Sequence, residues 1–563
     1  MAYFSLHAYD ADVWIPEFKG LTQDDTSLNP DVRFADEAEN VETPGGALQP
    51  HAAYEVKRWI FSSRVETLAK FHRRWYEGIG SKDWMVCASG GKLYYIQEGE
   101  NVEWDQIKMP TGISAFQSNA WSWVSYESTE GSPDRPVDVL LLSNAKDGMI
   151  MVIPPDRATI WDDNLEYTWN ALKGGTWGGA RSPAWNIRTV DTQGYKFGVI
   201  ERYAERIWGG NVANEPDLLV YSAPYDPTDW EPNTEIPEDG AGEVRQPSWD
   251  GDSFTGLKAF GDQLIAFKGN KAWRVMGTNP GEYAMSEQFG GGAPYPNTAA
   301  VYGEQIFMAD RDGMEVYDGM NATPYARDRF DRIWRTVNRA AMDQMCAAMQ
   351  KDRYYLALPV DGSDRNNALM VFNMAEGTIL YYNDIRIESF LQLNETLYAT
   401  SSDLPGRILI LHYDSWLNGK TSGAATKWVS PWMDFGYKRI VKGGFDMYFT
   451  PEVQEEAATL IFSIQTEKKV KTKRYTVKPL NVVSEGMEWQ EVKKHKWGTV
   501  IGNYTWSILG GRTDTTVRNF RAKRLHFSGT GRRFRVIIET EAGNTAPWRL
   551  IGGMQMVVET DPD

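Results

Sequence analysis

The sequence predicts an all-β protein: a β-propeller with a C-terminal β-sandwich domain and an extended N-terminal arm. Through the middle of the chain, short apolar runs alternate with turn signals. The 51 Gly and 27 Pro are spread along the chain, and the pattern changes near its two ends. Such spacing is typical of many short strands joined by turns. We therefore expect an arm over residues 1–60, the propeller over 61–424 and the sandwich over 425–563.

The N-terminal segment is polar and rich in turn formers. We interpret residues 1–60 as an extended arm, or as a strand donated to a neighbouring element. The first 20 residues lack a basic region followed by a long apolar run, so no secretion signal is expected. The chain also has no apolar run of about 18 residues, which predicts no membrane anchor.

The middle of the chain predicts one hairpin after another. Asp-Gly, Asn-Gly and Gly-Gly pairs separate the apolar runs, and glycine supplies the positive φ that tight turns need. Regular antiparallel modules without exact identity suggest radial repetition, and a propeller hides most strand edges in this way. The hairpin segments are 84–96, 137–153, 257–277, 304–319, 353–382 and 390–413.

Two segments show helical signals within this β pattern. Apolar residues of 326–345 recur at helical spacing, which predicts a helix packed against the propeller. Residues 63–76 are ambiguous, because Ser63 and Glu66 resemble a capping box while their surroundings favour strands.

The last part of the chain predicts a second all-β unit of ordinary domain size, a sandwich. Its expected strands lie within 427–450, 457–466, 504–509, 521–529, 532–541 and 548–559.

Charge is unevenly distributed. The net charge is −17, which argues against general coating of nucleic acid, yet residues 461–563 hold 18 Lys and Arg against 10 Asp and Glu. Basic runs occur at 468–474, 518–524 and 531–535. They are either solvated strand faces or a surface that docks an acidic partner.

No motif predicts catalysis, a cofactor or a metal site. The histidines lack zinc-site spacing, and there is no nucleophile elbow or phosphate-binding loop. The Asp-rich segments 310–313 and 361–367 offer too few oxygens for calcium and indicate turns. We interpret the glycine-rich segments 174–180 and 290–292 as loops. The six histidines are His7, His51, His72, His412, His495 and His526.

Two cysteines, Cys87 and Cys346, are too few for a disulfide framework. They are interpreted as reduced thiols, with one disulfide as the alternative.

Residues 202–230 carry a resemblance to a known family. An arginine–aliphatic–tryptophan strand is followed by an Asn-x-Pro turn, a Tyr-Ser pair and an Asp/Pro corner. The segments 254–277, 289–301 and 306–319 look like the same family, as do 18–23 and 36–50 near the N-terminus. The pattern resembles the tail hub, or nozzle, proteins of short-tailed bacteriophages, also called packaged-DNA stabilisation proteins. The matching residues of the first segment are Arg206, Ile207, Trp208, Asn214, Pro216, Tyr221, Ser222, Asp226 and Pro227.

The resemblance covers about residues 15–420 and implies a structural virion protein rather than an enzyme. The chain would form a homo-oligomeric ring, commonly hexameric, below the phage portal and adaptor proteins. That ring would continue and close the DNA channel and hold tail fibres or spikes, while genomic DNA passes through without sequence-specific binding. The protein would be made in the host cytoplasm and reside in the phage tail.

Two other classes of function stay open. One is a carbohydrate-binding or depolymerising tail protein, which needs a Trp-lined cleft and two carboxylates at a defined separation. The other is a non-viral propeller scaffold that recruits peptides and associates with no particle. Under the nozzle hypothesis, deletion of residues 1–55 should leave a folded propeller and impair incorporation into particles.

Overall fold

The structure is a computed structural model of the chain. It describes residues 10–561 apart from 24–30, 58, 74–81, 98–103, 129–136, 154–184, 246–251, 270, 289–294, 435–440 and 480–521.

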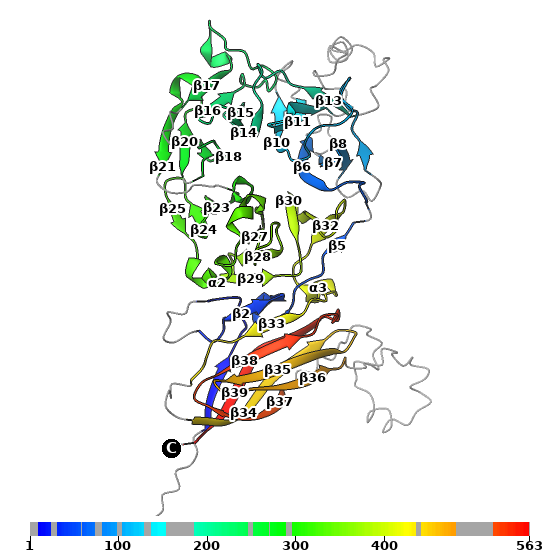
Figure 1. The fold of residues 1–563 in the computed structure, drawn as a ribbon, viewed down its shortest axis with the longest axis vertical. Helices are drawn as coiled ribbons and strands as arrows, with labels where there is room; N and C mark the ends of the chain where they lie inside the picture. Colours follow the sequence, from blue (N-terminus) through cyan, green and yellow to red (C-terminus); the bar gives the residue numbers. More distant parts are fainter. Residues whose placement is uncertain are drawn as a thin grey trace, which may run out of the picture. The chain divides into compact units, whose positions relative to one another are not determined.

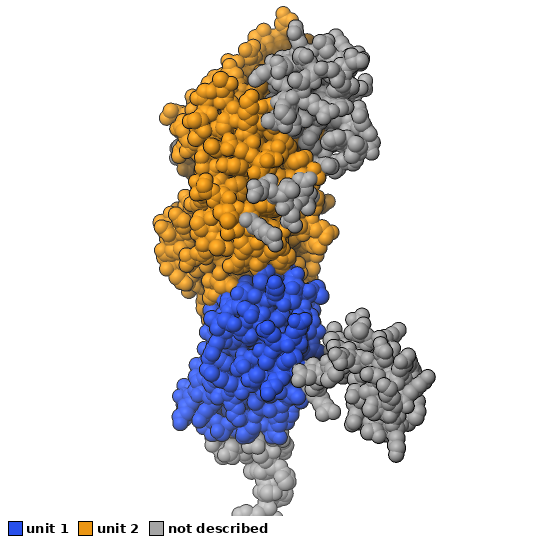
Figure 2. All heavy atoms as spheres, turned by 90° about the vertical axis from the view of Figure 1, so that its right-hand side faces the viewer, with its two compact units in different colours: residues 1–53, 413–563 blue, residues 54–412 orange. Residues whose placement is uncertain are grey.

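The described residues are all-β in character and fall into two compact units, which Figure 2 colours separately. Residues 54–412 form one unit, the propeller unit. Residues 1–53 and 413–563 together form the other, the sandwich unit. The chain therefore passes between the units twice, once in each direction.

The propeller unit contains seven four-stranded antiparallel sheets among its described residues, and Figure 1 shows them following one another around the propeller. The strands of the first four blades are β6 Val65–Arg73, β7 Lys82–Ser89, β8 Lys92–Gln97 and β9 Asp105–Gln106; β10 Ser122–Ser128, β11 Val137–Asn144, β12 Gly148–Ile153 and β13 Asn186–Thr189; β14 Phe197–Tyr203, β15 Arg206–Val212, β16 Leu218–Tyr221 and β17 Gly242–Arg245; and β18 Gly256–Phe260, β19 Gln263–Phe267, β20 Ala272–Met276 and β21 Ala284–Gln288. The last three contain β22 Ala300–Tyr302, β23 Gln305–Ala309, β24 Met314–Tyr317 and β25 Ala322–Pro324; β26 Cys346–Gln350, β27 Arg353–Leu358, β28 Ala368–Asn373 and β29 Thr378–Tyr382; and β30 Ile387–Leu393, β31 Thr396–Ser401 and β32 Ile408–Leu411 with β5 Glu55–Val56.

The last blade is completed by the start of the propeller segment. Strand β5 pairs with β32 through Val56 opposite Leu409 and Glu55 opposite Ile410. The first strands of neighbouring blades lie beside each other, and β30 of the last blade contacts β6 of the first. Pairing between the two ends of the segment therefore closes the ring of blades.

The propeller core lies between blades. One apolar cluster joins the second and third blades, for example through Leu141 and Ile207. Another joins the last blade to the first through Leu393 and Met85. Each blade therefore buries its apolar faces against its neighbours, so that a blade depends on the ring for its stability.

The sandwich unit consists of two sheets packed face to face. The four-stranded sheet has the order β1-β39-β34-β37 and the five-stranded sheet the order β2-β33-β38-β35-β36. Aromatic pairs join them: Phe445 lies 5.0 Å from Phe534, and Phe449 lies 4.3 Å from Phe462, between ring centroids. The strands are β1 Asp10–Ile15, β2 Glu37–Glu39, β33 Thr426–Val429, β34 Val441–Val453, β35 Ala458–Thr466, β36 Val470–Val477, β37 Lys523–Gly531, β38 Phe534–Thr540 and β39 Trp548–Asp561, with a separate pair, β3 Val41–Glu42 and β4 Gln49–Pro50.

The N-terminal segment is part of these folds, and the predicted arm over residues 1–60 is corrected accordingly. Strand β1 pairs with β39 and β2 pairs with β33, so the segment supplies one edge strand to each sheet of the sandwich. The donated strand was the alternative interpretation of the segment. The unit boundaries at 53/54 and 412/413 also differ from the predicted 61–424 and 425–563, because β5 belongs to the last blade.

Helical structure is short. The stripe over 326–345 predicted one helix, and this prediction is wrong for the backbone: Val337 forms a β-bridge with Val360, and the Asn338 side chain accepts a hydrogen bond from the Ala340 N–H. The ambiguous segment 63–76 contains strand β6. Among the described residues the helices are α2 Asp331–Trp334 and α3 Ser415–Asn418, with 3-10 turns at Pro44–Gly46, Pro237–Asp239, Pro280–Glu282, Pro296–Thr298, Arg327–Arg329 and Arg339–Gln344.

Two adjacent glycines in β39 offer a matched test of the contact between β1 and β39. Gly552 and Gly553 have φ of +67° and +71°. A Cβ on Gly553 would overlap the Ile15 carbonyl oxygen, whereas one on Gly552 meets nothing within 4 Å. We expect Gly552→Ala to cost about 1 kcal/mol of unfolding free energy from the left-handed backbone alone, and Gly553→Ala about 3 kcal/mol because the clash adds to it. Urea unfolding measures both, and equal losses would contradict the packing of β1 against Gly553.

A buried carboxylate, Glu42, connects separate parts of the sandwich unit. It is 1% exposed and accepts hydrogen bonds from the backbone N–H groups of Ala52 (2.9 Å), Asp414 (3.0 Å) and Ser415 (3.2 Å). The Gln49 amide is a fourth donor, at 3.3 Å. Burial is the largest influence on Glu42 and raises the pKa of its carboxyl above the usual 4.5, although these donors oppose the shift.

This raised pKa predicts a pH dependence of stability. Because the folded state binds the proton more tightly than the unfolded chain does, the stabilisation is complete below the unfolded pKa and is lost as pH rises through the folded pKa. Glu42→Gln should remove the pH-dependent stabilisation that comes from Glu42. As pH rises above about 4.5, the unfolding free energy of wild type should therefore fall relative to that of the variant. Urea unfolding at a series of pH values measures it, and a difference independent of pH would contradict the prediction.

Candidate functional site

The segment that carries the family resemblance is built into the third blade. Residues 202–230 cover the end of β14 and all of β15 and β16, which pair side by side. Asn214 adopts a left-handed φ of +65° in the turn between β15 and β16. The corner after β16 is closed locally: the Asp226 carboxylate accepts from the Thr228 N–H at 2.8 Å, and the Trp230 indole N–H donates to the Pro227 carbonyl at 3.0 Å.

Arg206 is the centre of this arrangement and is 1% exposed. Its Nη1 donates to the carbonyl of Ser222 at 2.7 Å and to that of Gly240 at 2.6 Å, and Nη2 donates to the carbonyl of Glu238. The guanidinium lies 5.1 Å from the ring centroid of Tyr221. A planar group with several fixed donors suits this task, because it can bind several carbonyls at once.

Aromatic side chains surround the Arg206 group. Trp208 is fully buried, and its ring lies 4.9 Å from that of Tyr221 and 5.0 Å from that of Tyr283. Burial raises the pKa of Tyr283 to about 12, although the Arg206 guanidinium opposes that shift. Both the motif and its partners therefore form a packed interior, with the tyrosine neutral at physiological pH.

The loop that Arg206 holds is acidic and exposed; we call residues 231–239, between β16 and β17, the acidic loop. Each of these nine residues is exposed. The loop is ordered by its own contacts: the Asn233 side chain accepts from the N–H groups of Glu235 and Ile236, both at 3.0 Å. The Asp239 N–H donates to the Ile236 carbonyl at 3.0 Å. These hydrogen bonds restrict the backbone of the loop.

The basic runs of the C-terminal part differ in their position in the sheets and in their ion pairs. Arg524 pairs with Asp446 at 2.7 Å, and Arg535 pairs with Asp36 at 3.2 Å, so both are neutralised within the unit. Residues 468–474 cover the turn between β35 and β36 and the first part of the exposed edge strand β36, where Arg474 pairs with Glu541 at 2.5 Å. Of the run 518–524, residues 518–521 lie outside the described residues.

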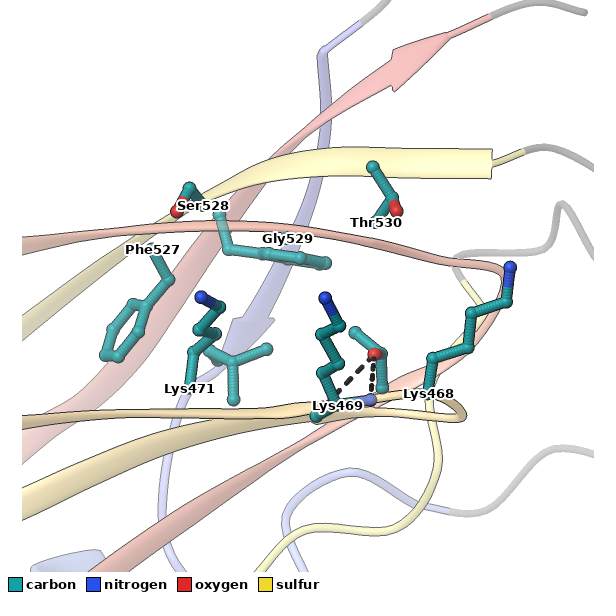
Figure 3. A pocket seen from close by; sticks show the side chains of 10 residues that line it. Lys468, Lys469, Lys471, Phe527, Ser528, Gly529 and Thr530 are labelled. Carbon is teal, nitrogen blue, oxygen red and sulfur yellow. Dashed lines mark hydrogen bonds between the residues drawn. The ribbon is translucent and has the colours of Figure 1, made fainter.

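A cavity of about 370 Å³ lies beside this hairpin. Lys468, Lys469 and Lys471 line one side of it, and Figure 3 shows the amino groups of Lys469 and Lys471 pointing toward β37, while that of Lys468 lies at the outer end of the turn. We call this cavity the lysine groove.

Two histidine–aspartate pairs were not anticipated from the sequence. His72 Nδ1 lies 2.5 Å from Asp83, and Lys70 lies 3.2 Å from the same carboxylate. Burial is the largest influence on Asp83 and would raise its pKa, but the hydrogen bonds from His72 and Lys70 outweigh it and lower the pKa. The nearby Ser125 hydroxyl accepts from the His72 backbone at 3.2 Å, so it is not arranged as a nucleophile against the ring.

The second pair lies in the sandwich unit, where His526 Nδ1 is 3.0 Å from Asp446. Arg524 is the main cause of the lowered pKa of Asp446. Because the carboxylate is also bound by Arg524, it is held in an ion-pair network typical of an exposed sheet face.

Other segments flagged in the sequence are placed as follows. The 310–313 segment closes a turn in which the Asp310 N–H donates to the Gly313 carbonyl at 2.8 Å, which agrees with its interpretation as a turn. Cys87 and Cys346 are buried free thiols in different blades. The glycine-rich segments 174–180 and 290–292 and the expected strand 504–509 lie outside the described residues.

Neither a cluster of metal ligands nor a long apolar helix occurs in the described part of the chain. It holds no group of three or more His, Cys, Asp or Glu side chains placed to bind a metal ion. Among its helices, none has the length and apolar character needed to cross a membrane.

Comparison with known proteins gives a distant structural likeness and no match in sequence. No protein-family model matches the chain, and no curated protein sequence matches it. Among solved structures, the WD40 domain of Neurospora crassa Pan2 is similar: it is 9% identical, and the match covers 63% of this chain and 90% of that chain with a TM-score of 0.32. At this identity and score the likeness carries no argument.

Proposed function

We propose that the chain is a structural protein of a bacteriophage virion, a nozzle or hub subunit of the tail. One observation supports this proposal most: the residues that carry the family resemblance form a buried support, centred on Arg206, that holds an exposed loop. A motif of this kind serves architecture, because Nη1 and Nη2 of Arg206 are bound to backbone carbonyls of the same blade.

The connectivity also suits a mechanical role. The propeller segment is inserted within the sandwich unit, so two covalent connections join the units. The ring of blades is closed by β5, which limits the free strand edges that the propeller presents. Force applied to one unit is thus transmitted to the other through two chain segments.

In the proposed role, several copies form a ring, a hexamer by the family resemblance, below the adaptor and portal proteins. The ring continues and closes the DNA channel and anchors fibres or spikes, and the chain is not an enzyme. The net charge of −17 agrees with a channel that lets DNA pass without gripping it, because grip requires neutralisation of phosphates.

The test is fractionation of phage particles from the source culture. Particles banded in a density gradient are probed with antibody to the chain, with soluble host-cell protein from the same culture as control. We expect the chain in the particle band at a low, fixed copy number that matches one ring. Its presence in the soluble fraction alone would contradict the proposal. Polysaccharide cleavage by the isolated chain would favour a depolymerising tail protein, and a soluble monomer would favour a propeller scaffold.

A further inference from the structure

The lysine groove lies where the two sheets of the sandwich unit meet at their edges. Strand β36 ends the five-stranded sheet, β37 ends the four-stranded sheet, and the two strands contact each other. The turn from β35 to β36 brings Lys468, Lys469 and Lys471 to this edge, opposite Ser528 and Thr530 of β37 (Figure 3).

The positive charge of the groove is not balanced by the described residues. Within them, no carboxylate forms an ion pair with Lys468, Lys469 or Lys471. The nearest acidic residue in the turn, Glu467, instead accepts from the backbone N–H groups of Arg532 (3.1 Å) and Arg533 (2.8 Å). The groove therefore attracts anions from outside the unit.

The accessible lining of the groove is polar. Its apolar residues, Phe445, Ile464 and Phe527, are each at most 2% exposed, and Thr466, Ser528 and Thr530 line it beside the lysines. An occupant therefore meets lysine amino groups and hydroxyl groups, and carboxylates can accept hydrogen bonds from both.

The acidic loop has the complementary features. It begins with Glu231, which accepts from the Gln193 amide at 3.3 Å, and it also carries Glu235, Glu238 and Asp239, none of whose side chains forms an ion pair with a described residue. Between these carboxylates lies Ile236, which is 48% exposed. Because Arg206 and Asn233 hold the backbone, little conformational entropy is lost when the loop is bound.

We propose that the acidic loop of one copy of the chain binds in the lysine groove of a second copy. The contact is heterologous, since it joins two different surfaces, and every copy offers one of each. Repetition of such a contact closes a ring when the rotation between copies closes. This inference rests on the proposed function and goes beyond it by naming the two surfaces that meet.

The contact supplies register and attraction rather than the whole interface. A stable interface buries about 1,600 Å² in total, more than one loop of nine residues covers. Complementary charges chiefly accelerate the encounter and fix the orientation of the partners. Association should therefore weaken as salt rises, because the charges lie at the surface.

The experiment uses the full chain and two charge-reversed variants. The loop variant carries Glu235→Lys, Glu238→Lys and Asp239→Lys, and the groove variant carries Lys468→Glu, Lys469→Glu and Lys471→Glu. A matched control with the same charge change as the loop variant carries Asp364→Lys, Glu455→Lys and Glu456→Lys, at exposed acidic residues outside both surfaces. Circular dichroism and thermal midpoints verify that all variants fold.

Sedimentation velocity at several salt concentrations then measures self-association. We expect wild type and control to associate, and each reversed variant alone to lose at least about tenfold in affinity, which corresponds to 1.4 kcal/mol. A mixture of the two variants should associate again, because each presents the surface that the other needs. A chain with all six substitutions should also self-associate.

Several results would overturn this inference. The first is a wild-type chain that stays monomeric under every condition, and the second is that the reversed variants associate as wild type does. The third is a mixture of the two variants that stays dissociated while the chain with all six substitutions associates. This third result would mean that the loop and the groove contact each other within one chain. Binding of duplex DNA that the groove variant abolishes, with self-association unchanged, would assign the groove to nucleic acid. If the chain is found in particles while these tests fail, the proposed function stands and only the assigned surfaces are lost.

Discussion

Deletion of residues 10–53 is expected to unfold the sandwich unit while the propeller unit stays folded. The segment supplies β1 and β2, one edge strand to each sheet. Its apolar side chains are deeply buried; Ile15, Phe18, Leu21 and Leu48 are each at most 1% exposed. Burial of each such side chain contributes about 1.5–3 kcal/mol, so that their joint loss matches the whole stability of a typical domain, about 5–15 kcal/mol.

Limited proteolysis with mass spectrometry measures this effect. We expect a fragment close to residues 54–412 to survive from the deletion variant, while 413–563 is degraded. Equal resistance of 413–563 in the variant and in wild type would contradict the account. The deletion ends before β5, since loss of that strand would also open the last blade.

Point substitutions provide a matched control for the deletion. Phe18 is 1% exposed and packs edge-on against Trp428, with 5.1 Å between ring centroids, whereas Trp14 is 65% exposed. Phe18→Ala should cost about 3–5 kcal/mol of unfolding free energy because it leaves a cavity, and Trp14→Ala less than about 1 kcal/mol.

Replacement of Arg206 by Met is expected to cost about 3–5 kcal/mol of unfolding free energy. The variant leaves the carbonyls of Ser222, Glu238 and Gly240 without their shared donor in a buried site. The cation–π contact with Tyr221 is lost as well. The unfolding free energy of Arg206→Lys should lie between those of wild type and Arg206→Met, because lysine keeps the charge but cannot bind three carbonyls with one planar group.

Urea unfolding measures the loss of unfolding free energy, and hydrogen exchange shows which residues lose protection. Amide protection should fall in 218–245, which contains β16, the acidic loop and β17, and stay unchanged in the sandwich unit. A variant within about 0.5 kcal/mol of wild type would contradict the assigned role of Arg206, because that is the range of an ordinary surface substitution.

The propeller was predictable because its hairpins are local. Several tight turns have their own glycine; Gly90 and Gly91, for example, have φ of +61° and +73° between β7 and β8. The number of blades was not predictable, because the closing strand β5 has only two residues, both exposed, and pairs across more than 350 positions of sequence. A strand of this length has no periodicity to detect.

The other differences also come from long-range contacts. The helical stripe of 326–345 correctly marks buried positions such as Phe330 and Trp334, but the bridge from Val337 to Val360 interrupts the helix. The resemblance drew attention to Arg206 without revealing its role, since its acceptors lie 16 to 34 residues away. The acidic loop had a visible signal, a cluster of Glu and Asp among prolines, directly after the segment that carries the resemblance.

Immunogold electron microscopy of particles from the source culture tests the central claim most directly. Antibody to the chain is applied before and after mild release of DNA, with pre-immune serum as the control. The account predicts gold at a single site, the tail or neck of the particle, in both states. Particles without label, together with soluble chain in the host cells, would contradict a role in the virion.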